Sequence, residues 1–180
     1  NRRKIRSKVL TDDELNRVKL AQTFISENLD IVIYDITDDI SKIQKITSKI
    51  QKHGKDEKDC IFIVDYLQLI TGSRHVNKVN EVGDYSRSLK LAAVNGAVIC
   101  LSQLSRAADG VRPMLSHLRD SGSIEQDADC VHFLHSTANG DAVEDITYII
   151  AKARDEKQGE FEVRFDKARY LFRDEYGDIV

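Results

Sequence analysis

Apolar side chains in the N-terminal third of the chain recur every three or four residues, which is the spacing of one face of an α-helix. Thr11 and Glu14 have the spacing of a capping box, so we expect a helix that begins at Thr11. Its stripe, mostly apolar, consists of Leu15, Val18, Gln22, Ile25 and Leu29. The apolar segment 31–36 then predicts a short strand.

A second helix follows, opened by Asp38 and Asp39 and ending near Gly54. Its apolar stripe consists of Ile40, Ile43, Ile46 and Ile50. The polar segment 71–80 predicts a loop, and the segment 82–95 predicts a further helix that Asn95-Gly96 ends.

Two continuous apolar runs predict central strands of a parallel sheet. The runs are 60–64 and 97–101, and runs of this kind are typical of strands that are buried on both faces. A third strand is expected over 129–134. The order strand, helix, strand indicates a layered α/β domain with right-handed crossovers.

The C-terminal quarter has the alternation of antiparallel strands. An apolar strand is expected over 146–151, and Phe161, Val163 and Phe165 alternate with charged residues, as do Tyr170 and Phe172. We expect these strands to continue the edge of the sheet. The chain contains no repeat or linker that would divide it, so residues 1–180 are predicted to form a single domain.

Composition narrows the class of protein. Hydrophobic residues make up 41% and charged residues 32% of the 180 positions, which excludes a disordered chain. No apolar run approaches the roughly 20 residues that span a bilayer. The net charge of −3 argues against a protein that coats nucleic acid with a wholly basic surface, but it is compatible with DNA contact through a few loops that line a channel. The three cysteines lie far apart without metal-ligand spacing, so we expect buried thiols in a reducing cytosol.

Two polar residues follow the predicted parallel strands. Asp65 ends one strand and Gln103 ends the next, and ligands of open α/β sheets collect at the carboxyl edge. Asp65 is a candidate for holding Mg²⁺ through water, and Gln103 for detecting a terminal phosphate. Taken alone, each also fits a solvated strand end.

Two further features carry candidate chemistry. Ser123 and Gln126 have capping-box spacing, which predicts a short helix after Ser123 whose free N–H groups are a candidate phosphate contact, or an ordinary capped turn. Lys152 and Arg154 lie two apart at the end of a strand and therefore point to one side of it. Two interpretations fit such a pair: it meets phosphate charge, for example on a neighbouring subunit, or it is solvated.

Together these segments closely resemble the DnaB family of replicative helicases. The resemblance covers most of the chain, from Thr11 to Phe172, and its most specific part is SGSIEQDAD at 121–129. The other segments are VDYLQL at 64–69, YSRSLK at 85–90, LSQLSR at 101–106, RP at 112–113 and AKAR at 151–154.

The resemblance implies a RecA-like P-loop ATPase core that uses ATP and Mg²⁺. Asp65 matches the Walker B aspartate that serves the metal, and Gln103 matches the sensor of the γ-phosphate. Lys152 and Arg154 match the basic pair that reaches the nucleotide of the adjacent subunit. The implied assembly is a hexameric, cytoplasmic ring, with primase and a helicase loader as further partners.

The resemblance also implies contacts with single-stranded DNA in a central channel. Arg119, Asp120 and Gly122 match the loop that holds the DNA backbone, and Arg74 and Lys78 match a second inward-facing loop more loosely. Contacts with the backbone suit a motor that must move along any sequence.

The chain departs from the family in one respect. The phosphate-binding motif Gly-x-x-x-x-Gly-Lys-Ser/Thr does not occur in it, nor does the segment with the family's catalytic glutamate. We therefore expect a fragment whose sheet edge beside Asp65 is uncovered, and which by itself binds ATP weakly or not at all and does not hydrolyse it.

Two other functions fit the same residues. One is a relative of the RecA-superfamily recombinases or a phage helicase fused to a primase. The other is a truncated RecA-superfamily accessory module that oligomerises or binds DNA without hydrolysing ATP. A phosphate-binding loop encoded upstream of Asn1 would favour a helicase, and its absence would favour the accessory module.

Overall fold

The computed structural model describes residues 2–7, 9–34, 42–56, 60–70, 78–118, 121–136 and 141–174. The chain divides into two compact units. The first consists of Asn1–Asp35, Ala138–Asp145 and Val163–Val180, and the second of Ile36–Thr137 and Ile146–Glu162.

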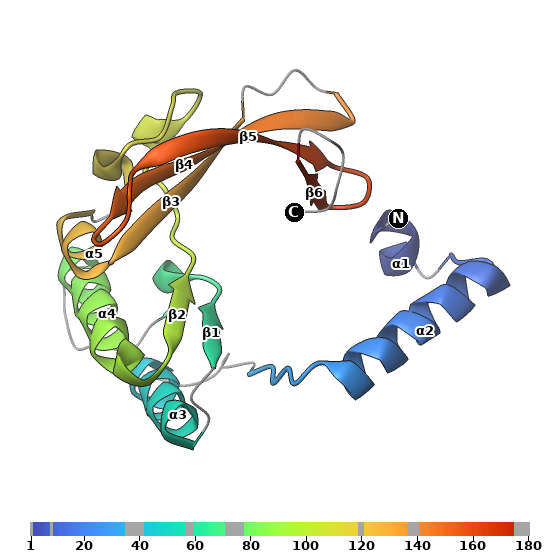
Figure 1. Ribbon diagram of the computed structural model, residues 1–180, viewed down its shortest axis with the longest axis horizontal. Helices are drawn as coiled ribbons and strands as arrows, with labels where there is room; N and C mark the ends of the chain where they lie inside the picture. Colours follow the sequence, from blue (N-terminus) through green and yellow to red (C-terminus); the bar gives the residue numbers. More distant parts are fainter. Residues whose placement is uncertain are drawn as a thin grey trace. The chain divides into compact units, whose positions relative to one another are not determined.

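The second unit contains a parallel pair of strands, β1 (Ile61–Val64) and β2 (Ala97–Cys100). The register runs from Ile61 opposite Ala97 to Val64 opposite Cys100. Helices α3 (Lys42–Asp56) and α4 (Lys78–Ala92) lie along one side of this pair (Figure 1). Because α4 connects the two parallel strands, this part is the strand, helix, strand unit that the sequence predicts.

One continuous core joins these elements. Its members come from α3, α4, the segment after β1 and the strands that follow, and they are Ile50, Leu67, Ile70, Val82, Tyr85, Leu89, Ala92, Leu118, Ile124, Val131, Phe133 and Ile149. Ile43 and Ile46 of α3 pack against the same core, so the predicted isoleucine stripe is its buried face within the described residues. Ile40, Asp38 and Asp39 lie outside the described residues.

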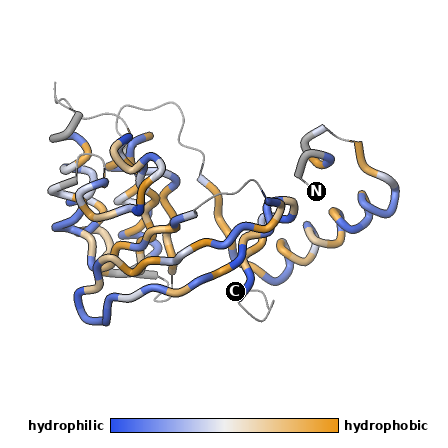
Figure 2. The backbone as a smooth tube through the Cα atoms, turned by 90° about the horizontal axis from the view of Figure 1, so that it is seen from above, coloured by the Kyte–Doolittle hydropathy of each residue, from blue (hydrophilic) through white to orange (hydrophobic). Residues whose placement is uncertain are grey.

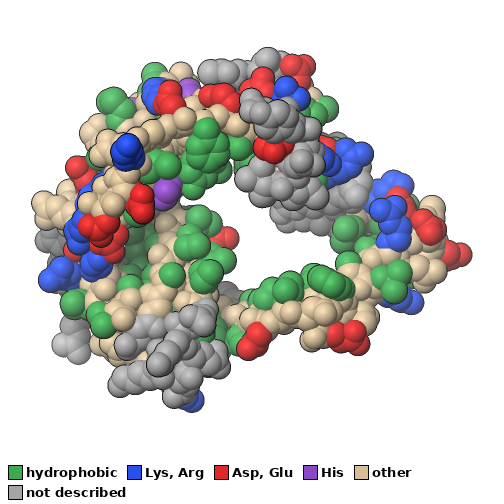
Figure 3. All heavy atoms as spheres, in the orientation of Figure 1, with side chains coloured by type: hydrophobic (Ala, Val, Ile, Leu, Met, Phe, Trp, Pro, Cys, Tyr) green, Lys and Arg blue, Asp and Glu red, His purple; other side chains and the backbone are tan. Residues whose placement is uncertain are grey.

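The prediction that both parallel strands are buried on both faces is wrong. Phe62, Val64, Val98 and Cys100 pack on the core, but Ile61 and Ile63 are 66% and 69% exposed. Ile99 is also exposed, and hydrophobic side chains gather at the surface over β1 and β2 (Figure 3). The reason is that the described helices cover only one face of this pair, and alternate side chains of a strand point to opposite faces.

The other strands form a four-stranded sheet in the order β3-β4-β5-β6. The strands are β3 (Cys130–Ser136), β4 (Val143–Ala153), β5 (Gly159–Asp166) and β6 (Leu171–Arg173). β3 pairs with β4, and β5 with β6, in antiparallel fashion. Within the described residues, the third predicted strand therefore belongs to the antiparallel sheet, and the parallel part of the fold is smaller than expected.

The first unit contains α1 (Arg2–Ser7) and α2 (Asp12–Asn28). The predicted capping box is confirmed, because Thr11 Oγ1 accepts from the Glu14 N–H and the Glu14 carboxylate accepts from the Thr11 N–H at 3.0 Å. Hydrophobic and hydrophilic residues alternate along the turns of α2 (Figure 2), but none of its residues is buried. Residues 31–34 form no strand, and 35–36 lie outside the described part of the chain.

Short turns and one short helix complete the second unit. Single 3-10 turns span Leu67–Leu69, Ala93–Asn95, Arg106–Ala108 and Leu115–His117. Helix α5 (Ser121–Asp127) begins before Ser123, so the predicted start after Ser123 is wrong. The predicted loop 71–80 is also too long, because α4 already begins at Lys78. In both places the helix extends over residues with little apolar periodicity of their own.

Candidate active site

Asp65 and Gln103 lie at the same end of the parallel pair. Asp65 directly follows Val64, the last residue of β1, and Gln103 follows Cys100, the last residue of β2. Val64 and Cys100 are opposite each other in a parallel register, so both strands deliver their polar residue to one edge. Both side chains are exposed. The expectation that the two share the carboxyl edge is therefore confirmed.

The side chain of Gln68 joins these two strand ends. Its Oε1 accepts the N–H of Gln103 at 3.0 Å, and its Nε2 donates to Ser102 Oγ at 2.9 Å and to the Gln103 carbonyl at 3.4 Å. The backbone continues the connection, because the Leu67 N–H donates to the Leu101 carbonyl at 2.9 Å. Sequence reasoning missed Gln68, although it lies within the segment VDYLQL that carries the resemblance.

Lys152 and Arg154 both reach helix α5. The Lys152 ammonium donates to the Glu125 carbonyl, and the Arg154 guanidinium donates to the Gln126 carbonyl at 3.5 Å. The pairing of β3 with β4 shifts by one residue just before Lys152, and bulges of this kind redirect side chains. The prediction that both cations point to one side of the strand is confirmed, because their partners are adjacent carbonyls of α5.

Asp129 is the carboxylate beside this basic pair. Arg154 Nη1 lies 2.9 Å from Asp129 Oδ1, and the Lys90 ammonium of α4 pairs with the other oxygen. The hydrogen bond from Lys90 holds the pKa of Asp129 below its usual value, and the charges of Lys90, Arg154 and Lys152 act in the same direction. Asp129 is therefore ionised at neutral pH.

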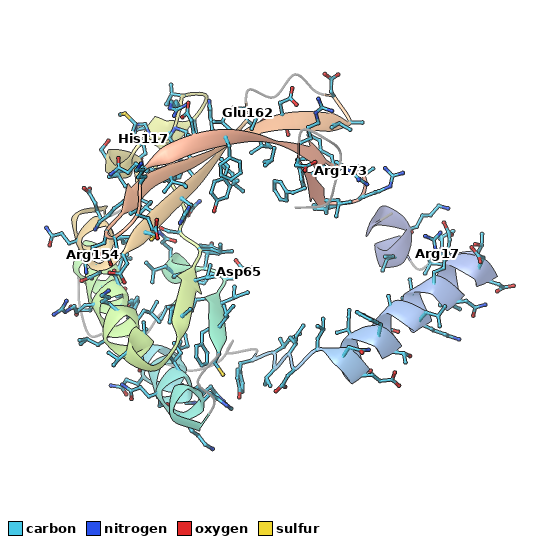
Figure 4. The ribbon with its side chains drawn as sticks, in the orientation of Figure 1. Arg17, Asp65, His117, Arg154, Glu162 and Arg173 are labelled. Atoms are coloured by element: carbon cyan, nitrogen blue, oxygen red, sulfur yellow. The ribbon has the colours of Figure 1, made fainter. Side chains whose placement is uncertain are left out.

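Asp65 and Arg154 occupy separate places on the second unit. Arg154 lies where β4 ends, next to α5, whereas Asp65 lies at the end of β1 (Figure 4). The predicted set is thus brought together as two groups: one contains Asp65 and Gln103, and the other contains Lys152 and Arg154.

The candidate DNA-binding residues are only partly described. Gly122 lies in the first turn of α5 and is exposed, and a Cβ built on it would meet no atom within 4 Å. Lys78 is the first residue of α4. Arg74, Arg119 and Asp120 lie outside the described residues.

The donor set at the strand ends is sparse. Within the described part of the chain, no group of three or more His, Cys, Asp or Glu side chains could hold a metal ion. One exposed carboxylate, Asp65, fits a metal that is held through water and by phosphate oxygens rather than by a cage of protein ligands. No helix among the described residues is long and apolar enough to cross a membrane.

The comparison with protein families decides the identity. The family model described as "DnaB-like helicase C terminal domain" matches residues 1–174. The chain belongs to this family. The DnaB-like domain of this chain is 36% identical to the replicative DNA helicase DnaB of Geobacillus stearothermophilus over 178 residues, which are 93% of this chain and 38% of that protein.

Other relatives support the same placement. A probable plasmid replicative DNA helicase of Chlamydia trachomatis is 40% identical over 131 residues, which are 70% of this chain and 28% of that protein. The DnaB-like chain thus spans well under half the length of these curated relatives.

Solved structures of DnaB-like proteins share the fold. A solved ATPase domain matches with a TM-score of 0.80 and 31% identity over 97% of this chain and 65% of that one. A DnaB-like replicative helicase, whose title describes its interactions with primase, matches with a TM-score of 0.78 and 32% identity over 100% of this chain and 45% of that one. The fold is therefore that of the RecA-like helicase ATPases.

Proposed function

We propose that this chain contributes to ATP-driven translocation on single-stranded DNA and to the unwinding of DNA in replication, as part of a ring helicase. The observation that carries the proposal is the split site. Asp65 and Gln103 share one edge of the parallel pair, while Lys152 and Arg154 share another surface beside α5. A split of this kind suits a nucleotide site that two neighbouring protomers build together.

The Asp65 half would face the nucleotide of its own protomer. Asp65 would hold Mg²⁺ through water, and the ion would neutralise charge on the ATP phosphates. Gln103, anchored at its main chain by Gln68, would sense the terminal phosphate with its exposed side-chain amide. Because Gln103 starts the segment that leads to the 3-10 turn Arg106–Ala108, a change at its side chain can be passed along the chain.

The Lys152 half would face the nucleotide of the adjacent protomer. A guanidinium placed against the transferring phosphoryl group stabilises the charge of the transition state, and such fingers raise turnover by about 10³–10⁵. Arg154 is exposed on this surface, which an approaching partner requires. The proposed assembly is a homo-oligomeric ring, with a hexamer as the family's form, and primase and a loader are proposed partners.

DNA contact is assigned to the residues just before α5 and to the first turn of that helix. Arg119, Asp120 and Gly122 would hold the phosphate backbone, with Arg74 and Lys78 as a second contact. Main-chain N–H groups of the protein can bind DNA phosphates without a basic surface. This kind of contact suits a domain whose net charge is −3. Binding to a single strand should weaken with salt, with a slope of roughly 0.7 per phosphate neutralised.

We further propose that the chain by itself binds ATP weakly or not at all and does not hydrolyse it. The phosphate-binding motif does not occur in residues 1–180. The exposed Ile61, Ile63 and Ile99 side chains form a sheet face of the kind that parallel folds normally cover. A complete RecA-like core would bury this face.

The decisive experiment uses the full-length protein that carries this chain. Arg154→Ala should lower ATP turnover by about 10³ or more while nucleotide affinity stays nearly normal, because the finger acts on a neighbouring protomer. Arg17→Ala, which removes an exposed arginine of α2, is the matched control and should leave both quantities unchanged. An equal loss of nucleotide binding would place Arg154 in its own protomer's pocket.

Mixed rings test the split site directly. Asp65→Asn and Arg154→Ala should each be inactive alone. A mixture should regain turnover, because some interfaces then combine an intact Asp65 with an intact Arg154. A mixture as inactive as its components would refute the shared site.

A second function, an accessory module that oligomerises or binds DNA without hydrolysis, is favoured by one observation, the lack of the phosphate-binding motif in residues 1–180. It predicts that no ring containing this chain loses turnover on Arg154→Ala. Turnover of rings that contain the Arg154→Ala variant therefore separates the two functions.

A further inference from the structure

Asp129 stands between a helix of the core and the basic pair. One carboxylate oxygen pairs with Lys90 in the last turn of α4, and the other lies 2.9 Å from Arg154 Nη1. The backbone is joined as well, since the Arg154 N–H donates to the Asp129 carbonyl at 3.0 Å. Asp129 therefore fixes both the main chain and the guanidinium of Arg154.

The two cations are also attached to the last turn of α5. Lys152 donates to the Glu125 carbonyl and Arg154 to the Gln126 carbonyl. Cations near a helix C-terminus satisfy carbonyl groups that have no partner within the helix and interact favourably with the helix dipole. A displacement of α5 along its axis thus displaces the points that hold Lys152 and Arg154.

Helix α5 is short and firmly packed. Ile124 is buried in the core, and Gly83 of α4 approaches so closely that a Cβ there would lie 2.7 Å from Ser123 Oγ. The seven-residue helix begins at Ser121, its first turn contains Gly122 of the proposed DNA contact, and Asp129 follows the helix by two residues. A helix of about two turns therefore connects the proposed DNA contact with the basic pair.

We propose that Asp129 is a positioning residue that couples DNA contact to the basic pair, by tying Arg154 to the C-terminal end of α5. The inference rests on the proposed function of this pair. A DNA strand bound at Gly122, in the first turn of α5, fixes the position of the helix, and Asp129 links that position to the Arg154 guanidinium. Hydrogen bonds between ionised partners are about twice as strong as neutral ones, which suits a connection that must hold its geometry.

Asp127 provides a matched comparison within the same segment. It pairs with Arg87 at 3.5 Å, so it also ties the end of α5 to α4. Among the described residues, Asp127 bonds neither Lys152 nor Arg154, whereas Asp129 bonds Arg154 twice. A merely structural role of these carboxylates would make the two residues equivalent.

The test measures ATP turnover in the full-length protein with and without single-stranded DNA. Asp129→Asn should lower the DNA-stimulated kcat by about tenfold, the loss expected for one charge-assisted hydrogen bond. The KM for ATP and the affinity for single-stranded DNA should stay within about twofold of the unaltered protein, because neither ligand contacts Asp129. Asp129→Glu keeps the charge and should restore most of kcat, and Asp127→Asn should leave kcat unchanged.

Three results would overturn the proposal: an unaltered kcat in Asp129→Asn, an equal fall in Asp127→Asn, or no recovery in Asp129→Glu. Arg154→Ala measured alongside identifies which proposal has failed. If Arg154→Ala abolishes turnover and Asp129→Asn does not change it, only the positioning role of Asp129 is wrong. If Arg154→Ala has no effect, the proposed function of the basic pair is wrong as well.

Discussion

The side-chain amide of Gln68 binds both the N–H and the carbonyl of the Gln103 main chain. Gln68 Oε1 accepts the Gln103 N–H at 3.0 Å, and Gln68 Nε2 donates to the Gln103 carbonyl at 3.4 Å. The two residues are 35 positions apart in the chain. These bonds fix the main chain of Gln103 and leave its side chain exposed.

Gln68→Ala should loosen this anchor. We expect the free energy of unfolding to fall by about 1 kcal/mol, since the bonds lost are partly exposed. Turnover in the full-length protein should fall more than nucleotide affinity does, because Gln103 would lose its fixed position rather than its chemistry. Steady-state kinetics and nucleotide titrations measure the two effects. Gln51→Ala, at an exposed position of α3, is the control, and equal effects of the two variants would contradict the prediction.

Gly83→Ala should destabilise the packing of α4 against α5. The new Cβ would lie 2.7 Å from Ser123 Oγ and 3.1 Å from Ser123 Cβ, so the Ser123 hydroxyl must rotate away and α5 must shift slightly. We expect a net loss of about 1–2 kcal/mol in the free energy of unfolding, since overpacking outweighs the higher helix propensity of alanine. Chemical denaturation measures it.

The matched control for this variant is Gly159→Ala, where a Cβ meets no atom within 4 Å. Adding Ser123→Gly to Gly83→Ala removes both atoms that the new Cβ would approach. The free energy of unfolding is then compared in a double-mutant cycle. If Gly83→Ala costs as much in the Ser123→Gly protein as in the unaltered protein, the close approach is not the cause.

Gly122→Ala separates stability from DNA contact. No atom lies within 4 Å of a Cβ at this position, and alanine favours the helix by up to about 1 kcal/mol, so stability should hold or rise. If the backbone of Gly122 approaches a phosphate, the affinity for single-stranded DNA should fall by about tenfold, the cost of one charge-assisted hydrogen bond. Fluorescence anisotropy with a labelled oligonucleotide measures this affinity. Unaltered binding would remove Gly122 from the DNA contact.

Cys100 should be the less reactive of two thiols. Burial raises the pKa of Cys100 to about 11, whereas Cys130 is exposed. Because the thiolate is the nucleophile, iodoacetamide at about pH 8 should modify Cys130 well before Cys100. Labelling of Cys100 should accelerate as the pH rises towards its pKa. Mass spectrometry of peptides follows both sites, and equal rates in the folded protein would contradict the prediction, while equal rates are expected in denaturant.

Local order was predictable where a few neighbouring residues decide it. The capping box of Thr11 and Glu14 fixes the start of α2, and the stripe Ile43, Ile46 and Ile50 gives α3 its buried face. The same holds for the polar ends of β1 and β2, because two parallel strands necessarily end at one edge. Segment 31–34 shows the limit, since apolar residues alone do not make a strand without a partner to pair with.

The candidate site was only half visible in the sequence. Asp65, Gln103, Lys152 and Arg154 follow from strand ends and from the family resemblance. Gln68 and Asp129 lie inside segments that carry the resemblance, but nothing in the sequence gives either residue a role. Gln68 meets Gln103 35 residues away, and Lys90 meets Asp129 39 residues away. Contacts over such separations depend on how strands and helices pack, which no short-range pattern encodes.

The sequence by itself determined the family, the capped start of α2, the buried face of α3 and the strands β1 to β6, because hydrophobic spacing and hydrogen bonds between near neighbours act locally. Only the tertiary structure decided that β3 joins an antiparallel sheet, that β1 and β2 are covered on a single face within the described residues, and that Arg154 is held by Asp129. These outcomes depend on which elements pack against one another, because residues far apart in the sequence form contacts only after folding brings them together.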